Sequence, residues 1–374
     1  VRAGRAALEG LTGKRFGLGG GKAPPFLVSV RSGAPVSMPG MMDTVLNLGL
    51  TLEGVEALAR ATGNPRFAWD SLRRLLAMYG EVVLGERPEG FGGMLSALKA
   101  ERGVGTDAAL GPEDLEELAY RYLRHLEARG TPFPLDPWAQ LQGAIEAVFK
   151  SWQNPRARTY RRIYGIPEDL GTAVVVQAMV FGNLGEDSGT GVGFTRNPAT
   201  GEKGLYGEYL RNAQGEDVVA GVRTPEPLER LKGYAPGLYE ELLQVAERLE
   251  RHFRDMQDFE FTVERGRLFL LQTRAGKRTA QAAVRIAVEM AEEGLISREE
   301  AVMRVEANAL PGLLRPSVDR DQAPRPLLKG LPASPGAAVG HAAFTNEAVE
   351  RFHAQGLPAV LVRPETTPED ITGM

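Results

Sequence analysis

Strand-like and helix-like patterns occupy separate stretches of this sequence. A short apolar run at residues 26–30 and a β-branched run at residues 171–182 are typical of strands. Between them, from about Leu52 to Glu127, apolar residues recur at helical spacing among charged ones. Alternation within the second run predicts a shared face for Ala173, Val175, Gln177 and Met179. We therefore expect an α+β fold with a helical insertion, and we expect residues 171–182 to form a buried strand.

The second half begins with a helix and a hairpin. Residues 236–255 have the apolar spacing of an amphipathic helix, and residues 258–274 alternate as two strands would. The expected apolar face of the helix carries Leu242, Val245, Leu249 and Phe253.

A helical connector is expected after the hairpin. Residues 279–293 have a helical pattern, and Ser297 with Glu300 matches a capping box. Prolines then punctuate residues 311–332, and we expect a new domain to begin near Leu328.

Composition excludes several classes of function. With 374 residues, 43% of them hydrophobic, the chain can form two or three domains. Its net charge of -4 gives no electrostatic case for nucleic acid or an anionic membrane surface. No cysteine is present and no apolar run approaches a membrane span, so we expect a cytoplasmic protein without thiolate chemistry. Because Val1 is not an initiator methionine and Met374 closes no recognisable element, we expect a truncated chain.

The hairpin offers oxygen ligands on one face. Asp258, Glu260 and Thr262 alternate with apolar residues. A three-residue loop, 264–266, would place Asp258 opposite Gln272 and turn Glu260 and Gln272 toward the same space. A two-residue loop would send Gln272 to the opposite face. In the first register, a carboxylate beside an amide oxygen would suit Mg²⁺, a hard ion; the alternative is a solvated strand face.

Three further features allow a ligand without requiring one. Arg31 follows an apolar run, where its fork of donors would grip a phosphate or pair with a structural carboxylate. The glycines of residues 185–194 would approach an anion, although a plain hairpin turn explains them better. Arginines at residues 156–162 fit a phosphate-rich ligand or, more simply, a solvent face. The GLGGGK run at residues 17–22 lacks the Ser or Thr of a P-loop, which we reject.

Several long runs, read together, resemble the pyruvate, phosphate dikinase family, and they stand in that family's order. They are VSVRSGAPVSMPGMMDTVLNLGL, NPRFAWDSLRRLL, AVFKSWQNPRARTYRRIYGIP, MVFGNLGEDSGTGVGFTRNPATGEKGLYGEYLRNAQGEDVVAGVRTP and DFEFTVERGRLFLLQTRAGKRTA. Runs of this length are far more specific than a short motif.

The resemblance implies an ATP-grasp nucleotide-binding domain, a helical connector and the truncated start of a swivelling β/α phosphohistidine domain. The implied divisions are residues 1–50 with 135–178 (first ATP-grasp subdomain), 51–134 (helical insertion), 179–275 (second subdomain), 276–325 (connector) and 326–374 (phosphohistidine domain).

The resemblance also implies a reaction. ATP would phosphorylate a histidine with its β-phosphoryl group, orthophosphate would take the γ-phosphoryl group, and a barrel domain would pass the phosphate to pyruvate. This chain would bind ATP with Mg²⁺ and lack both the histidine and the pyruvate site, so pyruvate, and a homodimer, would involve only the missing C-terminal domain. The family's ATP-contacting lysine segment is also missing.

The implied site residues follow from matching positions. Arg31 would bind the triphosphate, and Glu260 and Gln272 would hold Mg²⁺ and phosphate oxygens, supported by Asp258 and Arg274. Three further residues would complete the nucleotide site: Gln177 and Met179 beside the adenine, and Glu208 at the ribose or phosphates. Two alternatives remain at this point: a fragment of a phosphoenolpyruvate synthase-like dikinase, and a non-catalytic ATP-grasp remnant.

Overall fold

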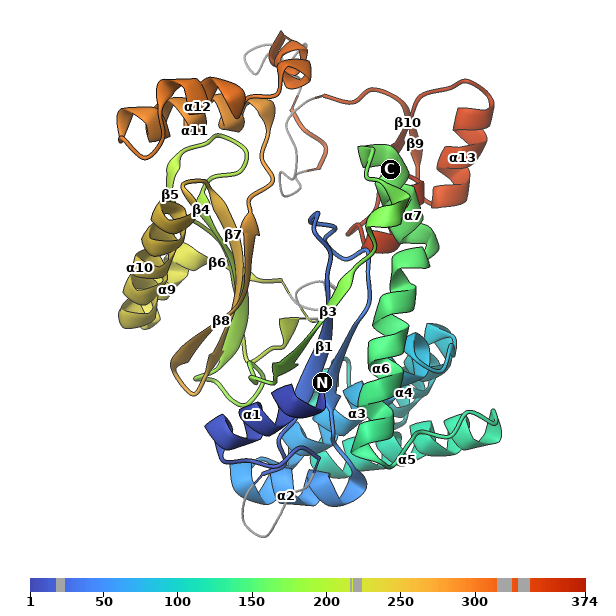
Figure 1. The fold of residues 1–374 in the computed structure, drawn as a ribbon. Coiled ribbons are helices and arrows are strands. Elements are labelled where there is room, and N and C mark those ends of the chain that lie inside the picture. Colours follow the sequence, from blue (N-terminus) through green and yellow to red (C-terminus); the bar gives the residue numbers. More distant parts are fainter. Residues whose placement is uncertain (18–23, 216, 218–223, 315–324, 329–336) are drawn as a thin grey trace. The chain divides into compact units, whose positions relative to one another are not determined.

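The computed structural model describes residues 1–17, 24–215, 217, 224–314, 325–328 and 337–374 (Figure 1). The chain divides into two units, Val1–Met179 and Val180–Met374, which are described separately below. Most of the GLGGGK run and most of the proline-rich stretch lie outside the described residues. Across the described ranges, no helix combines the length and the apolar character that crossing a bilayer requires.

The first unit contains a three-stranded antiparallel sheet. Its strands are β1 (Val28–Gly33), β2 (Thr44–Leu48) and β3 (Ala173–Ala178), in the order β2-β1-β3. Val30 and Val45 are paired across β1 and β2, and both are fully buried. Both valines lie in the core because helix α3 (Pro65–Val82) packs against β2 and helix α6 (Pro137–Lys150) packs against both strands.

Helices make up most of the remainder of this unit. They are α1 (Arg2–Thr12), α2 (Leu52–Thr62), α3 (Pro65–Val82), α4 (Pro88–Arg102), α5 (Pro112–Ala128), α6 (Pro137–Lys150) and α7 (Pro155–Tyr164). The side chains of Thr51, Asn64 and Asp136 cap α2, α3 and α6 by accepting a backbone N–H. The helical pattern expected for residues 52–127 is confirmed.

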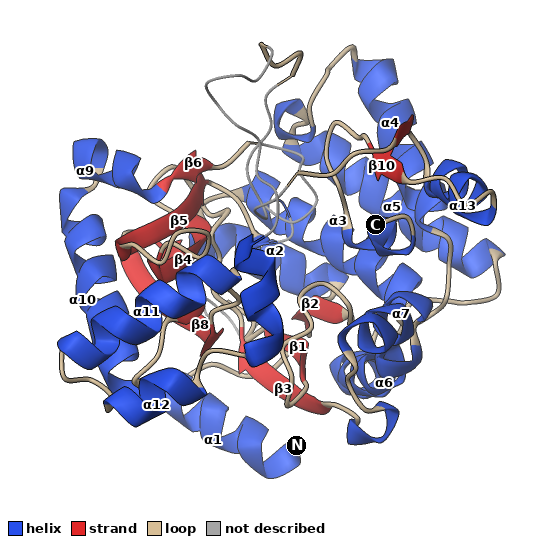
Figure 2. Cartoon of the chain, turned by 90° about the horizontal axis from the view of Figure 1, so that it is seen from above, coloured by secondary structure: helices blue, strands red, loops and turns tan. Residues whose placement is uncertain are grey.

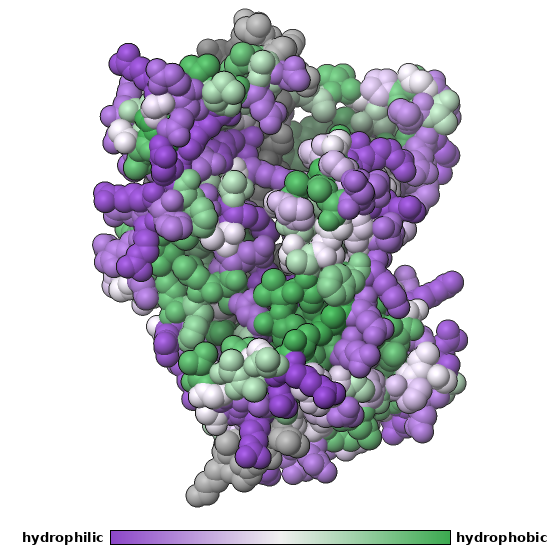
Figure 3. Space-filling view, viewed as in Figure 1, coloured by the Kyte–Doolittle hydropathy of each residue, from purple (hydrophilic) through white to green (hydrophobic). Residues whose placement is uncertain are grey.

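Strand β3 is not buried, contrary to expectation. Every residue of β3 is exposed or half-buried, and Val175 is 47% exposed. The β-branched composition indicated a strand correctly, but β3 lies at an edge of its sheet. Figure 3 shows strongly hydrophobic surface over the position that β3 has in Figure 1.

The second unit contains a five-stranded antiparallel sheet. Its strands, in the order β6-β5-β4-β7-β8, are β4 (Gly189–Arg196), β5 (Lys203–Arg211), β6 (Glu226–Pro227), β7 (Gln257–Glu264) and β8 (Arg267–Ala275). Helices α9 (Leu231–Tyr234) and α10 (Pro236–Phe253) lie beside it (Figures 1 and 2). Leu242 of α10 packs into one core with Phe259 and Phe261 of β7. The expected apolar face of α10 is largely confirmed, but Phe253 is 47% exposed.

The glycines of β4 serve this core. A Cβ on Gly191 would lie 2.5 Å from Cζ of Phe261, and one on Gly193 would lie 2.8 Å from Cε2 of Phe259. Both glycines therefore admit aromatic rings against the central strand. The interpretation of residues 185–194 as a plain hairpin turn holds only in part: residues 186–187 form a turn, but the run from Gly189 onward forms β4.

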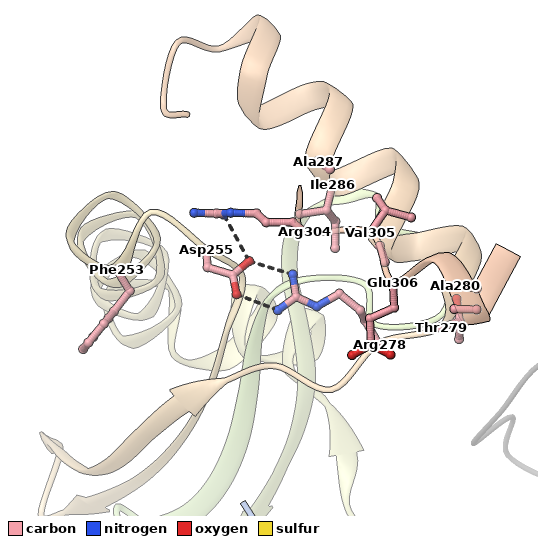
Figure 4. A pocket seen from close by; sticks show the side chains of 12 residues that line it. Phe253, Asp255, Arg278, Thr279, Ala280, Ile286, Ala287, Arg304, Val305 and Glu306 are labelled. Atoms are coloured by element: carbon pink, nitrogen blue, oxygen red, sulfur yellow. Dashed lines mark hydrogen bonds and ion pairs between the residues drawn. The ribbon is translucent and has the colours of Figure 1, made fainter. Parts of the chain in front are cut away.

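Connector helices follow the sheet. They are α11 (Ala280–Glu292), α12 (Arg298–Met303) and the 3₁₀ segment η5 (Ala307–Leu314). The capping box of Ser297 and Glu300 at the start of α12 is confirmed. A cavity of about 530 Å³ lies between α11, η5 and the end of α10. Figure 4 shows Asp255 between Arg278 and Arg304 in this cavity, 2.7 Å and 3.5 Å from their nearest guanidinium nitrogens.

The last described residues form a small β/α element. Strands β9 (His341–Ala343) and β10 (Ala359–Leu361) are parallel, and α13 (Asn346–Ala354) lies between them in sequence. The 3₁₀ segment η6 (Pro368–Thr372) follows. Together the described elements establish the α+β class.

Candidate functional site

The β7–β8 hairpin turns through Arg265 and Gly266, whose φ angles are 49° and 75°. Glu264 pairs with Arg267 across this two-residue turn. A positive φ at both central positions is typical of two-residue hairpin turns. A regular ladder from this turn would pair Gln272 with Phe259 and place it on the face opposite to Glu260. Instead the ladder shifts by one residue at Leu271, so that Gln272 pairs with Glu260.

The structure therefore corrects the expected register. The three-residue loop is wrong, and Asp258 lies opposite Arg274 rather than opposite Gln272. The two-residue loop is present. It was expected to send Gln272 to the face opposite to Glu260, but the bulge returns Gln272 to the same face. Glu260 and Gln272 are thus brought together by a feature that the sequence reasoning missed. The sequence carries no clear signal of the bulge, because residues 268–271 are all apolar and show no alternation for an extra residue to interrupt.

Arg274 neutralises the carboxylates beside it. Its Nε donates to Oδ2 of Asp258 at 2.9 Å, and its Nη2 donates to Oε1 of Glu260 at 3.1 Å. Burial raises the pKa of Asp258, and the charge of Arg274 only partly offsets that effect. Burial also disfavours the charge of Arg274, but Asp258 and then Glu260 outweigh it and raise the pKa of Arg274.

Glu208 joins the same face of the sheet. It pairs with Val192, which in turn pairs with Glu260 on β7. Directly paired residues point to the same side, so Glu208, Glu260 and Gln272 share one row. This side is opposite to the one that Phe259 and Phe261 present to α10. Burial raises the pKa of Glu208.

The remaining predicted residues belong to the first unit. Arg31 pairs with Val175, and Ser29 pairs with Gln177, so Arg31 and Gln177 lie on the same face of their sheet. Arg31 stands inside β1 rather than directly after it, and it is half-buried. Met179 follows β3, and its N–H donates to the carbonyl of Leu27 at 3.0 Å.

The donor set of the hairpin fits Mg²⁺. Glu260 offers a carboxylate and Gln272 an amide oxygen at directly paired positions. Mg²⁺ prefers oxygen ligands and usually takes one or two from protein, with phosphates and water completing an octahedron. Within the described ranges, no three His, Cys, Asp or Glu side chains gather into a metal-binding group.

The arginines of residues 156–162 are partly structural. Arg161 is fully buried, donates to the carbonyl of Trp152 and to Glu168 at 2.6 Å each, and stacks on the Trp152 ring. Arg156 pairs with Asp43 at 2.5 Å. A solvent face therefore does not explain these two, although Arg158 is exposed. Spacing could not reveal this, because their carboxylate partners lie elsewhere in the sequence.

Comparison with known families supplies the deciding observation. Residues 12–233 and 238–295 match the model of a family described as pyruvate phosphate dikinase, AMP/ATP-binding domain. The chain belongs to the pyruvate, phosphate dikinase family.

Individual dikinases are similar over nearly the whole chain. It is 55% identical to the pyruvate, phosphate dikinase of Clostridium symbiosum over 371 residues, which cover 98% of this chain and 42% of that protein. It is 52% identical to the Rhizobium meliloti (strain 1021) dikinase, covering 100% of this chain and 43% of the relative. The chloroplastic dikinase of Flaveria trinervia is 54% identical, and the match covers 95% of this chain and 38% of that protein. The chain thus spans about two fifths of the length of these curated relatives.

The match to the dikinase nucleotide domain includes every predicted site residue. Its first segment contains Arg31, Gln177, Met179 and Glu208. Its second segment contains Asp258, Glu260, Gln272 and Arg274. Helix α12 and the β9–β10 element lie beyond it.

Proposed function

We propose that this chain binds ATP with Mg²⁺ as the nucleotide-handling part of a pyruvate, phosphate dikinase. The observation that carries the proposal is the pairing of Glu260 with Gln272 beside the Asp258–Arg274 ion pair. Two oxygen donors next to a guanidinium are suited to a metal-bound phosphate. The family match to an AMP/ATP-binding domain supports the nucleotide as ligand.

The proposal includes an ATP-grasp architecture. Residues 1–50 with 135–178 would form one subdomain and residues 179–275 the other, with residues 51–134 as a helical insertion. The connector would be residues 276–325, and residues 326–374 would begin the phosphohistidine domain. Antiparallel sheets in both units and the parallel β9–β10 pair support this division.

Each site residue has a role in the proposal. Arg31 would clamp the triphosphate with its fork of donors, and Gln177 and Met179 would border the adenine. Glu208, whose raised pKa reflects burial, would accept a hydrogen bond from the ribose. Arg274 would hold Asp258 and Glu260 in place and balance their charge.

Phosphoryl transfer needs positioning and charge neutralisation more than covalent help from side chains. Bound Mg²⁺ would neutralise phosphate charge, and Glu260 and Gln272 are the residues that would hold it. In the complete enzyme, the products from ATP, orthophosphate and pyruvate would be AMP, diphosphate and phosphoenolpyruvate through a phosphohistidine. The use of orthophosphate and pyruvate as phosphoryl acceptors is proposed for the whole enzyme and not for this chain alone.

Calorimetric titration of this chain with ATP, with and without Mg²⁺, tests the proposal. We expect Mg²⁺-dependent binding that is lost in Arg31→Ala and in Glu260→Ala. Matched controls are Arg60→Ala and Glu247→Ala, whose side chains are 66% and 63% exposed in surface ion pairs and which should bind normally. Binding that persists unchanged in Glu260→Ala would overturn the proposed metal site.

A further inference from the structure

The loop between β1 and β2 is tied to a distant part of the first unit. The loop ends at Asp43, which directly precedes Thr44, the cross-strand partner of Arg31. The N–H of Asp43 donates to Oγ of Ser151 at 3.1 Å. Nδ2 of Asn154 donates to Oδ2 of Asp43 at 2.9 Å, so both the backbone and the side chain of Asp43 are held.

Arg156 completes this attachment with two contacts. Its Nη2 donates to Oδ1 of Asp43 at 2.5 Å, and its Nε donates to the carbonyl of Met41 at 3.2 Å. The side chains of Arg156 and Asp43 are 23% and 16% exposed, so water screens the pair only partly. One guanidinium thus contacts two positions of the loop just before β2, the strand that pairs with β1 beside Arg31.

Asn154 gives up its usual local role to this contact. It is the N-cap residue of α7, yet its side chain caps no backbone N–H of the helix. The side chain bonds to Asp43 instead, and the carboxylate of Asp43 therefore lies near the positive end of α7. Loss of an N-cap hydrogen bond normally destabilises a helix, so we infer that the contact with Asp43 compensates for it.

The segment that holds the loop, residues 151–164, is itself anchored by buried side chains. Arg161 bonds to Glu168 and stacks on Trp152 at 4.0 Å, and Nε1 of Trp152 donates to the carbonyl of Glu168 at 3.0 Å. Ala157 and Tyr160 of α7 are also buried. The loop is thus restrained at Met41 and Asp43, directly before Thr44, the residue of β2 that pairs with Arg31.

We propose that Arg156 and Asp43 are positioning residues for Arg31, setting the β1–β2 loop so that the Arg31 guanidinium is ordered before ATP arrives. The inference rests on the proposed function of Arg31. It assigns no contact between ATP and Arg156. Because misplacement of a binding group costs affinity steeply, we expect Arg156→Met to weaken MgATP binding about 10- to 100-fold.

The test is calorimetric titration of the full chain with ATP and Mg²⁺. Arg156→Met and Asp43→Asn should both weaken binding, whereas Arg156→Lys, which keeps the charge, should recover part of it. Arg158→Met, on an exposed position of the same helix, is the matched control and should bind as the unaltered chain does. All three tryptophans, at 69, 138 and 152, lie in the first unit, so fluorescence melting reports whether a variant has simply unfolded there.

A double-mutant cycle with Arg31→Lys separates positioning from general damage. If Arg156 acts through Arg31, Arg156→Met should weaken binding much less in the Arg31→Lys background than in the unaltered chain. An equal loss in both backgrounds, or normal binding by a folded Arg156→Met chain, would overturn the inference while leaving the proposed function intact. Failure of the unaltered chain to bind ATP would overturn the proposed function itself.

Discussion

Glu260 and Gln272 are paired directly across β7 and β8 at the point where the ladder shifts register. The extra residue in β8 is Leu271, and the pair would also form in a regular ladder that lacked this residue. Whether the two oxygen donors lie on the same face therefore depends on the number of β8 residues that pair between the turn and Gln272.

Deleting Leu271 is accordingly expected to preserve the site. The deletion removes the bulge and leaves Glu260 opposite Gln272, so Mg²⁺-dependent ATP binding should change by a few-fold at most. Deleting Thr273 instead should move Arg274 out of register with Asp258 and weaken binding strongly. Calorimetric titration compares the two deletions, and equal losses in both would show that the twist of the bulge itself is required.

Asp258 should respond to the loss of Arg274. Burial raises the pKa of Asp258 and Arg274 opposes that rise, so Arg274→Gln should raise the pKa further. Carboxyl ¹³C titration by NMR measures it, with Asp258→Asn to assign the signal. Arg278→Gln is the control, because Arg278 bonds to Asp255 and not to Asp258; a lower pKa in Arg274→Gln would contradict the assigned cause.

The raised pKa of Asp258 makes the stability of the fold depend on pH. Because the folded pKa of Asp258 lies above its unfolded value, the protonated form favours the folded state. This contribution is full below the unfolded pKa and is lost as the pH rises through the folded pKa. Arg274→Gln should move that loss to higher pH, which denaturant unfolding at a series of pH values would detect.

Gly193 should tolerate no side chain. In Gly193→Ala the new Cβ would collide with the ring of Phe259, and we expect a loss of about 1–3 kcal/mol in the free energy of unfolding. Gly237→Ala in α10 meets no atom within 4 Å and should be neutral or stabilising by about 0.4–1 kcal/mol. Far-UV circular dichroism in urea measures both, and an unaffected Gly193→Ala would contradict the packing argument.

Arg196 should be a large contributor to the stability of the second unit. It is fully buried and bonds to Glu250, Glu289 and Glu293 at 2.8 to 3.0 Å. Arg196→Met leaves buried Glu250 without its partner, so we expect a loss of about 3–5 kcal/mol.

The exposed pair of Arg251 with Glu247 provides the control, since Arg251→Met should cost about 0–1 kcal/mol. The tryptophans of the first unit give an internal reference. Circular dichroism should shift to lower urea in Arg196→Met while the fluorescence transition stays in place. A loss of less than about 1 kcal/mol would show that the three glutamates find other partners.

Local sequence determined the elements that depend on neighbouring residues. The helix of residues 236–253 and the capping box of Ser297 and Glu300 were predictable because periodicity and capping act over one or two turns. The identity of the candidate site residues also came from the sequence, through long runs that resemble one family.

Tertiary structure alone decided where several of those residues lie. Gln272 faces Glu260 only because the sheet accommodates Leu271 as a bulge, and β3 is half-exposed because it is an edge strand. Arg156 lies 113 residues from its carboxylate partner, Asp43. Register, burial and ion pairing are settled by contacts between distant segments, which hydrophobic patterns and capping motifs do not encode.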